Sequence, residues 1–382
     1  MPAVEHDGAR IHYETVGPSG APVLVLANSL GTTLGMWNAQ MAALSQRFLV
    51  VRYDHRGHGR SSATPGPYTV ALLGGDCLAV LDDLGVARAS LIGLSLGGAV
   101  AMWVASHAPE RVERLVLCCT APAFPPPQQW AERAALVRAQ GVVQLLDTLM
   151  GRWFTASFDD RGGEVRQLID AMLRSVEPEG YAGCCEAVGA MDQTADLAAI
   201  VAPTLVIAGA ADPVVPPTVA VDLSTRIANA SLLALSGSAH LANIEQPTRF
   251  TEAVISHLVG TAAERGDRVR RTVLGDAHVD RSAASATAFT AGFLDLVERS
   301  AWGEVWTRPG LDRATRSCIT LAMLVALRQF DELELHVRGA LRNGVSRDQI
   351  AEVLLQTAVY CGFPAANSAF AAARRALEEP GA

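Results

Sequence analysis

Short, continuously apolar segments place the strongest constraint on how this chain folds. They occur between residues 22 and 258, at 23–26, 48–51, 90–93, 114–117 and 204–207. Strands that are covered on both faces have such runs, whereas strands with one wet face alternate apolar and polar residues. Because stretches of helical pattern separate the runs, the sequence predicts an α/β fold with a mostly parallel sheet.

A long segment of helical pattern interrupts this alternation. It separates the strand that ends near Cys118 from the strand that begins near Thr204, and it opens with the prolines at 125–127. We expect this segment to form a helical cap over the edge of the sheet, at about residues 123–200.

The character of the sequence changes after residue 259. The chain has 382 residues, more than the usual range of about 100–200 for one domain, so a second domain is the default expectation. Residues 260–271 are polar and charged, and we expect a linker there. From 272 to 382 the patterns are helical, with a capping box at Ser346 and Gln349. The sequence therefore predicts an α/β domain at 1–259 followed by an all-helical domain.

The charged residues exclude several classes of function. All 31 basic residues are arginines, and 39 residues are acidic, which gives a formal net charge of -8. Without a lysine the chain cannot form a Schiff base, bind pyridoxal phosphate through one, or build a phosphate loop that uses a lysine. Because an acidic chain without a basic run cannot neutralise many phosphates, we expect no nucleic-acid partner.

The cysteines and the apolar stretches indicate the compartment. The seven cysteines include two adjacent pairs and no CxxC spacing, which suits neither a disulfide framework nor a zinc ribbon. We expect a reducing cytoplasm and no metal site. Residues 1–15 have charges where a signal peptide has its apolar core, and the longest apolar stretch, at 91–105, is interrupted by glycines. We therefore expect no export and no membrane span.

The motif Gly-Leu-Ser-Leu-Gly at residues 93–97 indicates a nucleophilic serine. It follows a predicted strand directly and precedes a helical run at 99–106. A sharp turn between strand and helix exposes the serine hydroxyl, and the glycines let neighbouring backbone pack without Cβ clashes. In this context, rather than as a chance turn, the motif predicts that Ser95 is a catalytic nucleophile.

Two further residues complete a catalytic triad. A serine hydroxyl reacts when a base accepts its proton and an acid orients that base. Asp212 follows one predicted strand and His240 follows an apolar run at 232–235, so both are expected on loops at strand ends. The alternative is that Asp212 forms a turn and His240 is a surface histidine. The backbone amides of Leu30 and Leu96 are expected to bind the oxyanion.

These motifs together resemble those of the α/β hydrolases. Besides the serine motif and the two loops, residues 54–61 read Asp-His-Arg-Gly-His-Gly-Arg-Ser. Residues 28–33, Asn-Ser-Leu-Gly-Thr-Thr, followed by Met36 and Trp37, are similar to the 3-oxoadipate enol-lactonases in particular. The resemblance covers the first domain and implies a hydrolase that opens an enol-lactone.

The last third of the chain resembles 4-carboxymuconolactone decarboxylase. The matching residues are Glu-Leu-Glu-Leu-His at 332–336, Asn343-Gly344 and the segment 356–364. Together, the two halves resemble the fused decarboxylase and lactonase of the protocatechuate branch of aromatic degradation. This implies small lactone carboxylates as substrates and a homo-oligomer that assembles through the helical domain.

Decarboxylation of such a lactone needs no cofactor. The electrons left by CO2 can delocalise through the ring alkene into the lactone carbonyl, so the reaction needs a proton source and a donor near the lactone oxygen. His336 and Glu332 lie four residues apart on one predicted helix. We expect His336 to donate or shuttle the proton and Glu332 to orient it, with Arg316 and Tyr360 as candidates for carboxylate and oxyanion contacts. The alternative is a surface pair without a catalytic role.

The cap segment contains candidates for binding a substrate carboxylate. Arginine suits this task because its guanidinium group binds a carboxylate in a forked geometry. The cap has two tryptophans and three arginines close in sequence: Trp130, Arg133, Arg138, Arg152 and Trp153. Among them we expect Arg133 first, together with Trp130, in the substrate pocket.

A second hypothesis keeps the hydrolase but changes its role. The first domain would then be a general carboxylesterase or a cofactor-free perhydrolase, and the helical domain an inactive oligomerisation module. A 271–382 fragment that assembles without releasing CO2 would favour this hypothesis.

Overall fold

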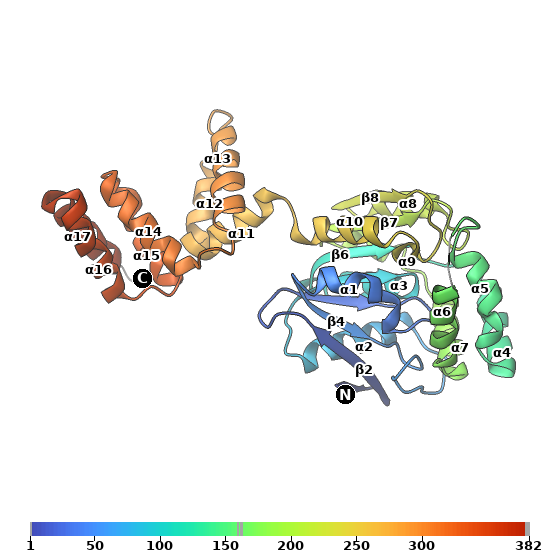
Figure 1. Cartoon of the computed structure of the whole chain (residues 1–382). Coiled ribbons are helices and arrows are strands. Elements are labelled where there is room, and N and C mark those ends of the chain that lie inside the picture. The colour runs from blue at the N-terminus through green and yellow to red at the C-terminus, as the bar shows by residue number, and fades with distance from the viewer. Residues whose placement is uncertain (1, 159, 161–162, 379–382) are drawn as a thin grey trace. The chain divides into compact units, whose positions relative to one another are not determined.

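The computed structural model describes residues 2–158, 160 and 163–378. The chain divides into two compact units, Met1–Leu258 and Val259–Ala382. Every strand among the described residues belongs to the first unit, and the second is built from helices (Figure 1). None of the helices in the described ranges combines the length and the apolar character that crossing a bilayer would require.

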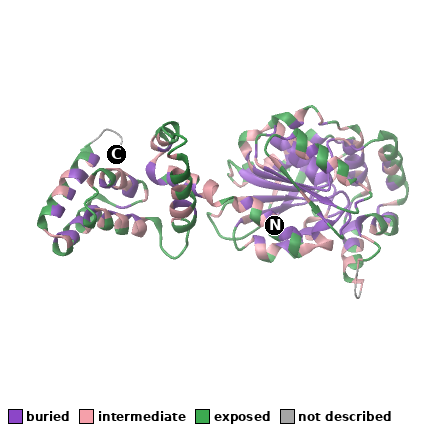
Figure 2. Cartoon of the chain, turned by 90° about the horizontal axis from the view of Figure 1, so that it is seen from above, coloured by how far each residue is buried: buried purple, intermediate pink, exposed green. Residues whose placement is uncertain are grey.

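The first unit is built on one eight-stranded sheet. Its strands are β1 (Ala3–His6), β2 (Ala9–Val16), β3 (Val23–Ala27), β4 (Leu49–Tyr53), β5 (Ala89–Leu94), β6 (Val112–Cys118), β7 (Thr204–Gly209) and β8 (Ala230–Leu235). They lie in the order β1-β2-β4-β3-β5-β6-β7-β8, and all neighbours from β4 onward are parallel. Every residue of β5 is buried, because helices cover both faces of the sheet (Figure 2). The predicted α/β fold is confirmed, with the apolar runs of the sequence as β3 to β7.

β1 and β2 form a hairpin that apolar runs do not reveal. The strands pair antiparallel, with His6 opposite Ala9. The two residues between them, Asp7 and Gly8, both have positive φ, at 43° and 74°. Asp-Gly is typical of the two-residue turns whose twist matches that of paired strands. Part of β1 is exposed, so its sequence lacks the continuous apolar character of the inner strands.

The helices of the first unit flank the sheet and form the cap. They are η1 (Leu34–Trp37), α1 (Asn38–Leu44), α2 (Val70–Asp83), α3 (Leu96–His107), η2 (Pro109–Arg111), α4 (Pro127–Gln140), η3 (Val143–Leu145), α5 (Leu146–Trp153), α6 (Glu164–Arg174), α7 (Pro178–Ala190), η5 (Asp196–Ala199), α8 (Pro217–Arg226), α9 (Ala242–Glu245) and α10 (Pro247–Val259). Figure 1 shows α4 to α7 gathered in one group, and α4 packs along α7. This group is the helical cap, and it lies within the segment where a cap was expected.

The second unit is helical throughout its described residues, as expected. Its helices are α11 (Ala262–Leu274), α12 (Asp276–Ala284), α13 (Ala291–Val297), the π-helical η6 (Glu298–Val305), α14 (Arg313–Ala326), α15 (Phe330–Arg342), α16 (Arg347–Cys361) and α17 (Phe363–Glu378). Leu333 and Leu354 belong to a core formed by α14 to α17, and Trp302 belongs to a smaller core against α11. The predicted capping box is confirmed, because the Ser346 hydroxyl accepts from the Gln349 amide at 3.1 Å.

The segment at 260–271 is not a linker, contrary to the expectation from its charges. Most of it belongs to α11, whose first turn is closed by a capping box between Thr261 and Glu264. Val269 and Val273, four residues apart, are buried. Charged residues fill the outward face of α11 and only a narrow apolar stripe faces the core, so the segment resembles a solvated linker in sequence.

Candidate active sites

Ser95 stands on a strained turn between β5 and α3. Its φ of 56° and ψ of −112° lie in a region that residues with a Cβ atom rarely adopt. A Cβ atom on Gly93 would lie 2.1 Å from the carbonyl oxygen of Gly97, and one on Gly97 would lie 2.1 Å from that of Ala27. The two glycines of the motif therefore permit the close packing that supports the turn. The turn places Ser95 in the lining of a cavity of about 720 Å³.

The predicted acid and base are in direct contact. His240 Nδ1 donates to Asp212 Oδ2 over 2.8 Å, and both side chains are buried. The other oxygen of Asp212 accepts from the amides of Val214 and Val215, at 2.7 and 3.1 Å. Because the carboxylate only accepts, it holds the proton of His240 on Nδ1 and leaves Nε2 as the basic nitrogen. His240 and Ser95 line the same cavity.

Two neutral histidines support the loop that is expected to bind the oxyanion. Burial lowers the pKa of His55 to about 3 and that of His58 to about 4. His58 Nε2 therefore accepts from the amide of Gly31 at 3.1 Å, and His55 Nε2 donates to the carbonyl of Asn28 at 3.0 Å. Leu30, within this loop, lines the cavity.

Asn28 connects this loop to the nucleophile turn. Its carbonyl accepts from the amide of Gly97 at 2.9 Å, one residue beyond Leu96. Its side-chain oxygen accepts from Trp37 Nε1, also at 2.9 Å. The two segments predicted to supply oxyanion donors, through Leu30 and Leu96, are therefore hydrogen-bonded to each other. Oxyanion binding by these two amides stays a prediction.

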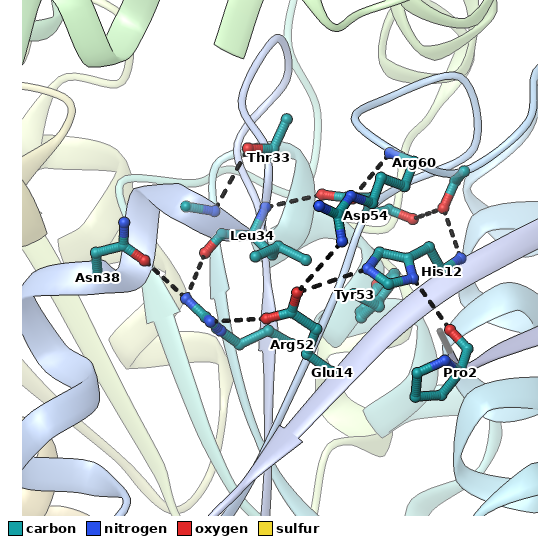
Figure 3. Close-up of polar contacts among 12 residues, drawn as sticks. Pro2, His12, Glu14, Thr33, Leu34, Asn38, Arg52, Tyr53, Asp54 and Arg60 are labelled. Carbon is teal, nitrogen blue, oxygen red and sulfur yellow. Dashed lines mark hydrogen bonds and ion pairs between the residues drawn. The ribbon is translucent and has the colours of Figure 1, made fainter. Parts of the chain in front are cut away.

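A polar network supports the far end of the same loop (Figure 3). The carboxylate of Asp54 accepts from the amides of Leu34 and Arg60, at 2.8 and 3.1 Å. Burial raises the pKa of Asp54, and these two amide hydrogen bonds oppose the rise. Arg52 donates to the carbonyl of Leu34 at 3.2 Å and pairs with Glu14 at 3.0 Å. The loop after β3 is thus fixed at both ends, which preorganises its backbone.

Cap residues supply another part of the cavity lining. Trp130 and Arg133, both expected in the pocket, are among the lining residues, and the Arg133 guanidinium lies 5.6 Å from the centroid of the Trp130 ring. Arg138 has a different position. It pairs with Glu179 and Glu186 at 2.7 and 2.6 Å and is not among the lining residues, so it stabilises the cap.

Tyr181 is a lining residue that the sequence analysis missed. Arg152 and Trp153 line the cavity as well. Tyr181 belongs to α7 and is fully buried, and its hydroxyl has no hydrogen-bond partner among the described residues. No local motif marks this tyrosine, because its place in the cavity depends on how α7 packs against the rest of the unit.

Cys119 lies beside the acid and base. Its sulfur, a carboxylate oxygen of Asp212 and a ring nitrogen of His240 lie within 4.8 Å of one another, a separation that a metal ion could bridge. A metal would need the thiolate, but burial and the negative charge of Asp212 raise the pKa of Cys119. The carboxylate and the imidazole are already bonded to each other. The chemistry of this group therefore fits a hydrogen-bonded pair of carboxylate and imidazole with a neutral thiol beside it.

The second unit brings His336 into a cluster of aromatic and charged groups. The His336 ring lies parallel to Trp302, with 6.4 Å between centroids and 2° between planes. Burial lowers the pKa of His336, the charge of Glu332 opposes this shift, and His278 adds to it. His278, on α12, was missed in the sequence. Burial and nearby arginines lower its pKa, and Glu332 raises it. We call His278, Trp302, Glu332 and His336 the histidine cluster.

Arg316 and Tyr360, the other two candidate residues in this unit, are not part of the histidine cluster. Arg316 lies on α14 and donates from Nη2 to the carbonyl of Arg308 at 2.9 Å. Its Nε is buried without a hydrogen-bond partner among the described residues. Tyr360 lies on α16 and is 79 % exposed. Tyr360 is therefore part of an outer surface of the unit.

The fold and the geometry around Ser95 define an α/β hydrolase. A family model described as alpha/beta hydrolase fold matches residues 22–152. A second model, described as Carboxymuconolactone decarboxylase family, matches residues 291–375. The two matches fall in different units of the chain.

Individual relatives extend these matches. Over 244 aligned residues the chain is 40 % identical to 3-oxoadipate enol-lactonase 2 of Acinetobacter baylyi. The alignment covers 64 % of this chain and 91 % of that protein. The crystal structure of the enol-lactonase from Burkholderia xenovorans is 41 % identical, with a TM-score of 0.66, and covers 68 % of this chain and 100 % of that one. Over 118 aligned residues the chain is 43 % identical to 4-carboxymuconolactone decarboxylase of Acinetobacter baylyi. This alignment covers 31 % of this chain and 88 % of that protein. The chain belongs to the enol-lactonase family of α/β hydrolases through its first part and to the carboxymuconolactone decarboxylase family through its second.

Proposed function

We propose that this fused enzyme catalyses two consecutive reactions of the 3-oxoadipate pathway. The second unit decarboxylates 4-carboxymuconolactone, and the first unit hydrolyses the resulting enol-lactone to 3-oxoadipate. The proposal depends on one observation: one part of the chain is similar to an enol-lactonase, and another part is similar to a 4-carboxymuconolactone decarboxylase. Loss of CO2 from the substrate named for one relative yields the substrate named for the other.

The triad supports an acyl-enzyme mechanism for the hydrolysis. Ser95 Oγ attacks the lactone carbonyl while His240 Nε2 takes its proton, and Asp212 stabilises the imidazolium that forms. The amides of Leu30 and Leu96 bind the oxyanion. When the ring C–O bond breaks, the imidazolium returns the proton to the enol oxygen, and the enol becomes a ketone. Water then attacks the acyl-enzyme with His240 as the base, which releases 3-oxoadipate.

The histidine cluster supports the decarboxylation. The bond to the carboxylate carbon breaks, and its electron pair moves through the ring alkene onto the carbonyl oxygen of the lactone, from which it returns when the ring carbon is protonated. His336 donates a proton to the ring carbon as the alkene shifts, and it regains that proton from solvent. Glu332 acts as a positioning residue, because its charge favours the protonated form of His336. The lysine-free composition is compatible with this route, which needs no iminium.

The cap arginines support recognition of a carboxylate in the hydrolase cavity. We propose that Arg133 binds the side-chain carboxylate of the enol-lactone and that Trp130 packs against its ring. Arg133 lines the cavity and stacks on Trp130, so its guanidinium group is held near the position that a ligand would occupy.

The purified chain, supplied with 4-carboxymuconolactone, tests the proposed function. We expect release of one CO2 and formation of one 3-oxoadipate per lactone consumed, measured by CO2 detection and by chromatography of the acid. Supplied enol-lactone should give 3-oxoadipate without CO2. A chain that hydrolyses simple aryl esters but leaves both lactones intact would instead be a general carboxylesterase with an inactive helical unit.

The exposed surface of the second unit supports a homo-oligomer. Most of the exposed large hydrophobic residues of the described chain lie in this unit, including Leu355, Val359 and Phe363, which are 56 %, 75 % and 78 % exposed. Leu355 and Val359 are four residues apart on α16 and so share one face. Exposed large apolar side chains that share a helix face often mark a protein–protein interface. We propose that a second copy of the chain covers it.

Leu355→Glu combined with Val359→Arg is expected to dissociate the oligomer. The new pair is spaced to stabilise α16 by an ion pair while removing its apolar stripe. Sedimentation velocity should find the parent chain well above 40.2 kDa and the double variant at 40.2 kDa. Val201→Glu is the matched control, because Val201 is 62 % exposed in the first unit. A double variant that sediments like the parent would show that this face of α16 is not part of the interface.

A further inference from the structure

Tyr181 has a buried hydroxyl without a partner at the wall of the hydrolase cavity. Its side chain is fully buried, and its Oη has no hydrogen-bond partner among the described residues. Tyr181 nevertheless belongs to the lining of the cavity that contains Ser95 and His240. Burying a hydroxyl without a hydrogen bond is unfavourable, so such a group in a binding cavity points to a partner that arrives with the ligand.

The surroundings of Tyr181 place its hydroxyl end beside the loop that supports the oxyanion site. Its ring stacks on His58, with 6.4 Å between centroids and 23° between planes. A Cβ atom built on Gly31 would lie 3.0 Å from Tyr181 Cε2, a ring carbon next to the one that carries the hydroxyl. Gly31 in turn donates its amide to His58. The Tyr181 ring therefore packs against both His58 and Gly31, and these contacts limit where its hydroxyl can lie.

The charges around Tyr181 favour an anionic partner. Burial raises the pKa of Tyr181, so the hydroxyl stays protonated and can donate a hydrogen bond. The positive charges of Arg133 and Arg152 act on this hydroxyl and oppose the rise in its pKa. The same positive charges would stabilise a negatively charged ligand group placed beside the hydroxyl. Both arginines also line the cavity. The Arg152 side chain is long and exposed, so it can move aside to let a ligand oxygen reach the buried hydroxyl.

We propose that the Tyr181 hydroxyl donates a hydrogen bond to the side-chain carboxylate of the bound enol-lactone and so selects substrates that carry this group. The inference rests on the proposed hydrolase function and extends it to substrate selection. Tyr181 would complement Arg133: the guanidinium supplies charge, and the hydroxyl supplies a donor of fixed direction.

Tyr181→Phe tests the proposal because it removes only the hydroxyl. For the carboxylated enol-lactone we expect kcat/KM to fall by about 10- to 100-fold, mostly through KM, as for loss of a hydrogen bond to a charged group. For α-angelica lactone, the same ring with a methyl group in place of the carboxymethyl group, we expect no change in kcat/KM. The Tm of the variant should equal or exceed that of the parent, because an unpaired buried hydroxyl has been removed.

Tyr68→Phe is the matched control. Tyr68 is also buried in the first unit, but its hydroxyl donates to the carbonyl of Thr64 at 2.6 Å and lies outside the cavity lining. This control should lower the Tm and leave KM for the enol-lactone unchanged. A purely structural role for Tyr181 would make its variant behave in the same way.

The outcomes separate this inference from the proposed function. If the parent chain does not hydrolyse the enol-lactone, the proposed function and the inference both fail. If the parent hydrolyses it and Tyr181→Phe has the parental KM, only the role of Tyr181 is wrong. If kcat/KM of the variant falls equally for α-angelica lactone, the hydroxyl does not bind the carboxylate, and the inference is overturned as well.

Discussion

Ser95→Ala is expected to lower kcat for enol-lactone hydrolysis by about 10⁴-fold or more, because the reaction loses its nucleophile. The remaining triad cannot compensate. His240 and Asp212 are still bonded to each other in this variant, but no hydroxyl stands on the strained turn to attack the lactone. The loss of lactone absorbance with supplied enol-lactone measures the effect.

The same variant should accumulate enol-lactone when it is supplied with 4-carboxymuconolactone. CO2 would be released at the parental rate, while 3-oxoadipate would form only at the spontaneous rate. Ser106→Ala is a suitable control, because Ser106 lies in the last turn of α3 and its hydroxyl donates to the carbonyl of Met102 within that helix. Residual hydrolysis near the parental rate in Ser95→Ala would assign the reaction to another nucleophile.

His336→Ala is expected to lower the rate of decarboxylation by about 10²- to 10⁴-fold, which is the usual contribution of a general acid. The variant loses the proposed proton donor to the ring carbon and also the partner of the parallel stack with Trp302. Hydrolysis of supplied enol-lactone should continue at the parental rate. CO2 release from 4-carboxymuconolactone is the direct measurement.

The Ser95 and His336 variants control each other. Each should abolish one reaction and preserve the other. The preserved reaction reports that the unit without the substitution is folded, and far-ultraviolet circular dichroism reports the helices of the substituted unit. Decarboxylation at the parental rate by His336→Ala would show that the histidine cluster is not the site of this reaction. Loss of both reactions in that variant would indicate that the substitution unfolds more than the cluster, and His336→Gln, which keeps a polar side chain of similar length, would then decide.

Local patterns were sufficient to predict the inner strands β3 to β7 and the turn that carries Ser95. A buried parallel strand needs apolar residues at every position, so β3 to β7 are visible as continuous runs. The turn at Ser95 needs glycines at fixed offsets, because a Cβ atom on Gly93 or Gly97 would overlap the backbone. Such requirements involve residues close together in sequence, and a motif can therefore express them.

Features that depend on contacts between distant segments could not be predicted from the sequence. α11 has too few apolar residues to be distinguished from a linker until its buried face meets η6. His278 and His336 lie on different helices, and no spacing rule relates them. Tyr181 has no motif at all, since its significance is an unpaired hydroxyl at a cavity wall.

The sequence by itself determined which residues can supply the chemistry: a serine on a glycine-flanked turn, an acid and a histidine in the matching order, and a lysine-free composition that excludes amine catalysis. Only the tertiary structure decided which groups meet, through the 2.8 Å contact of Asp212 with His240 and the position of Tyr181 beside Gly31. The physical reason is that backbone geometry and helix capping depend on neighbouring residues. Burial, charge and the satisfaction of hydrogen bonds depend on everything that packs around a group.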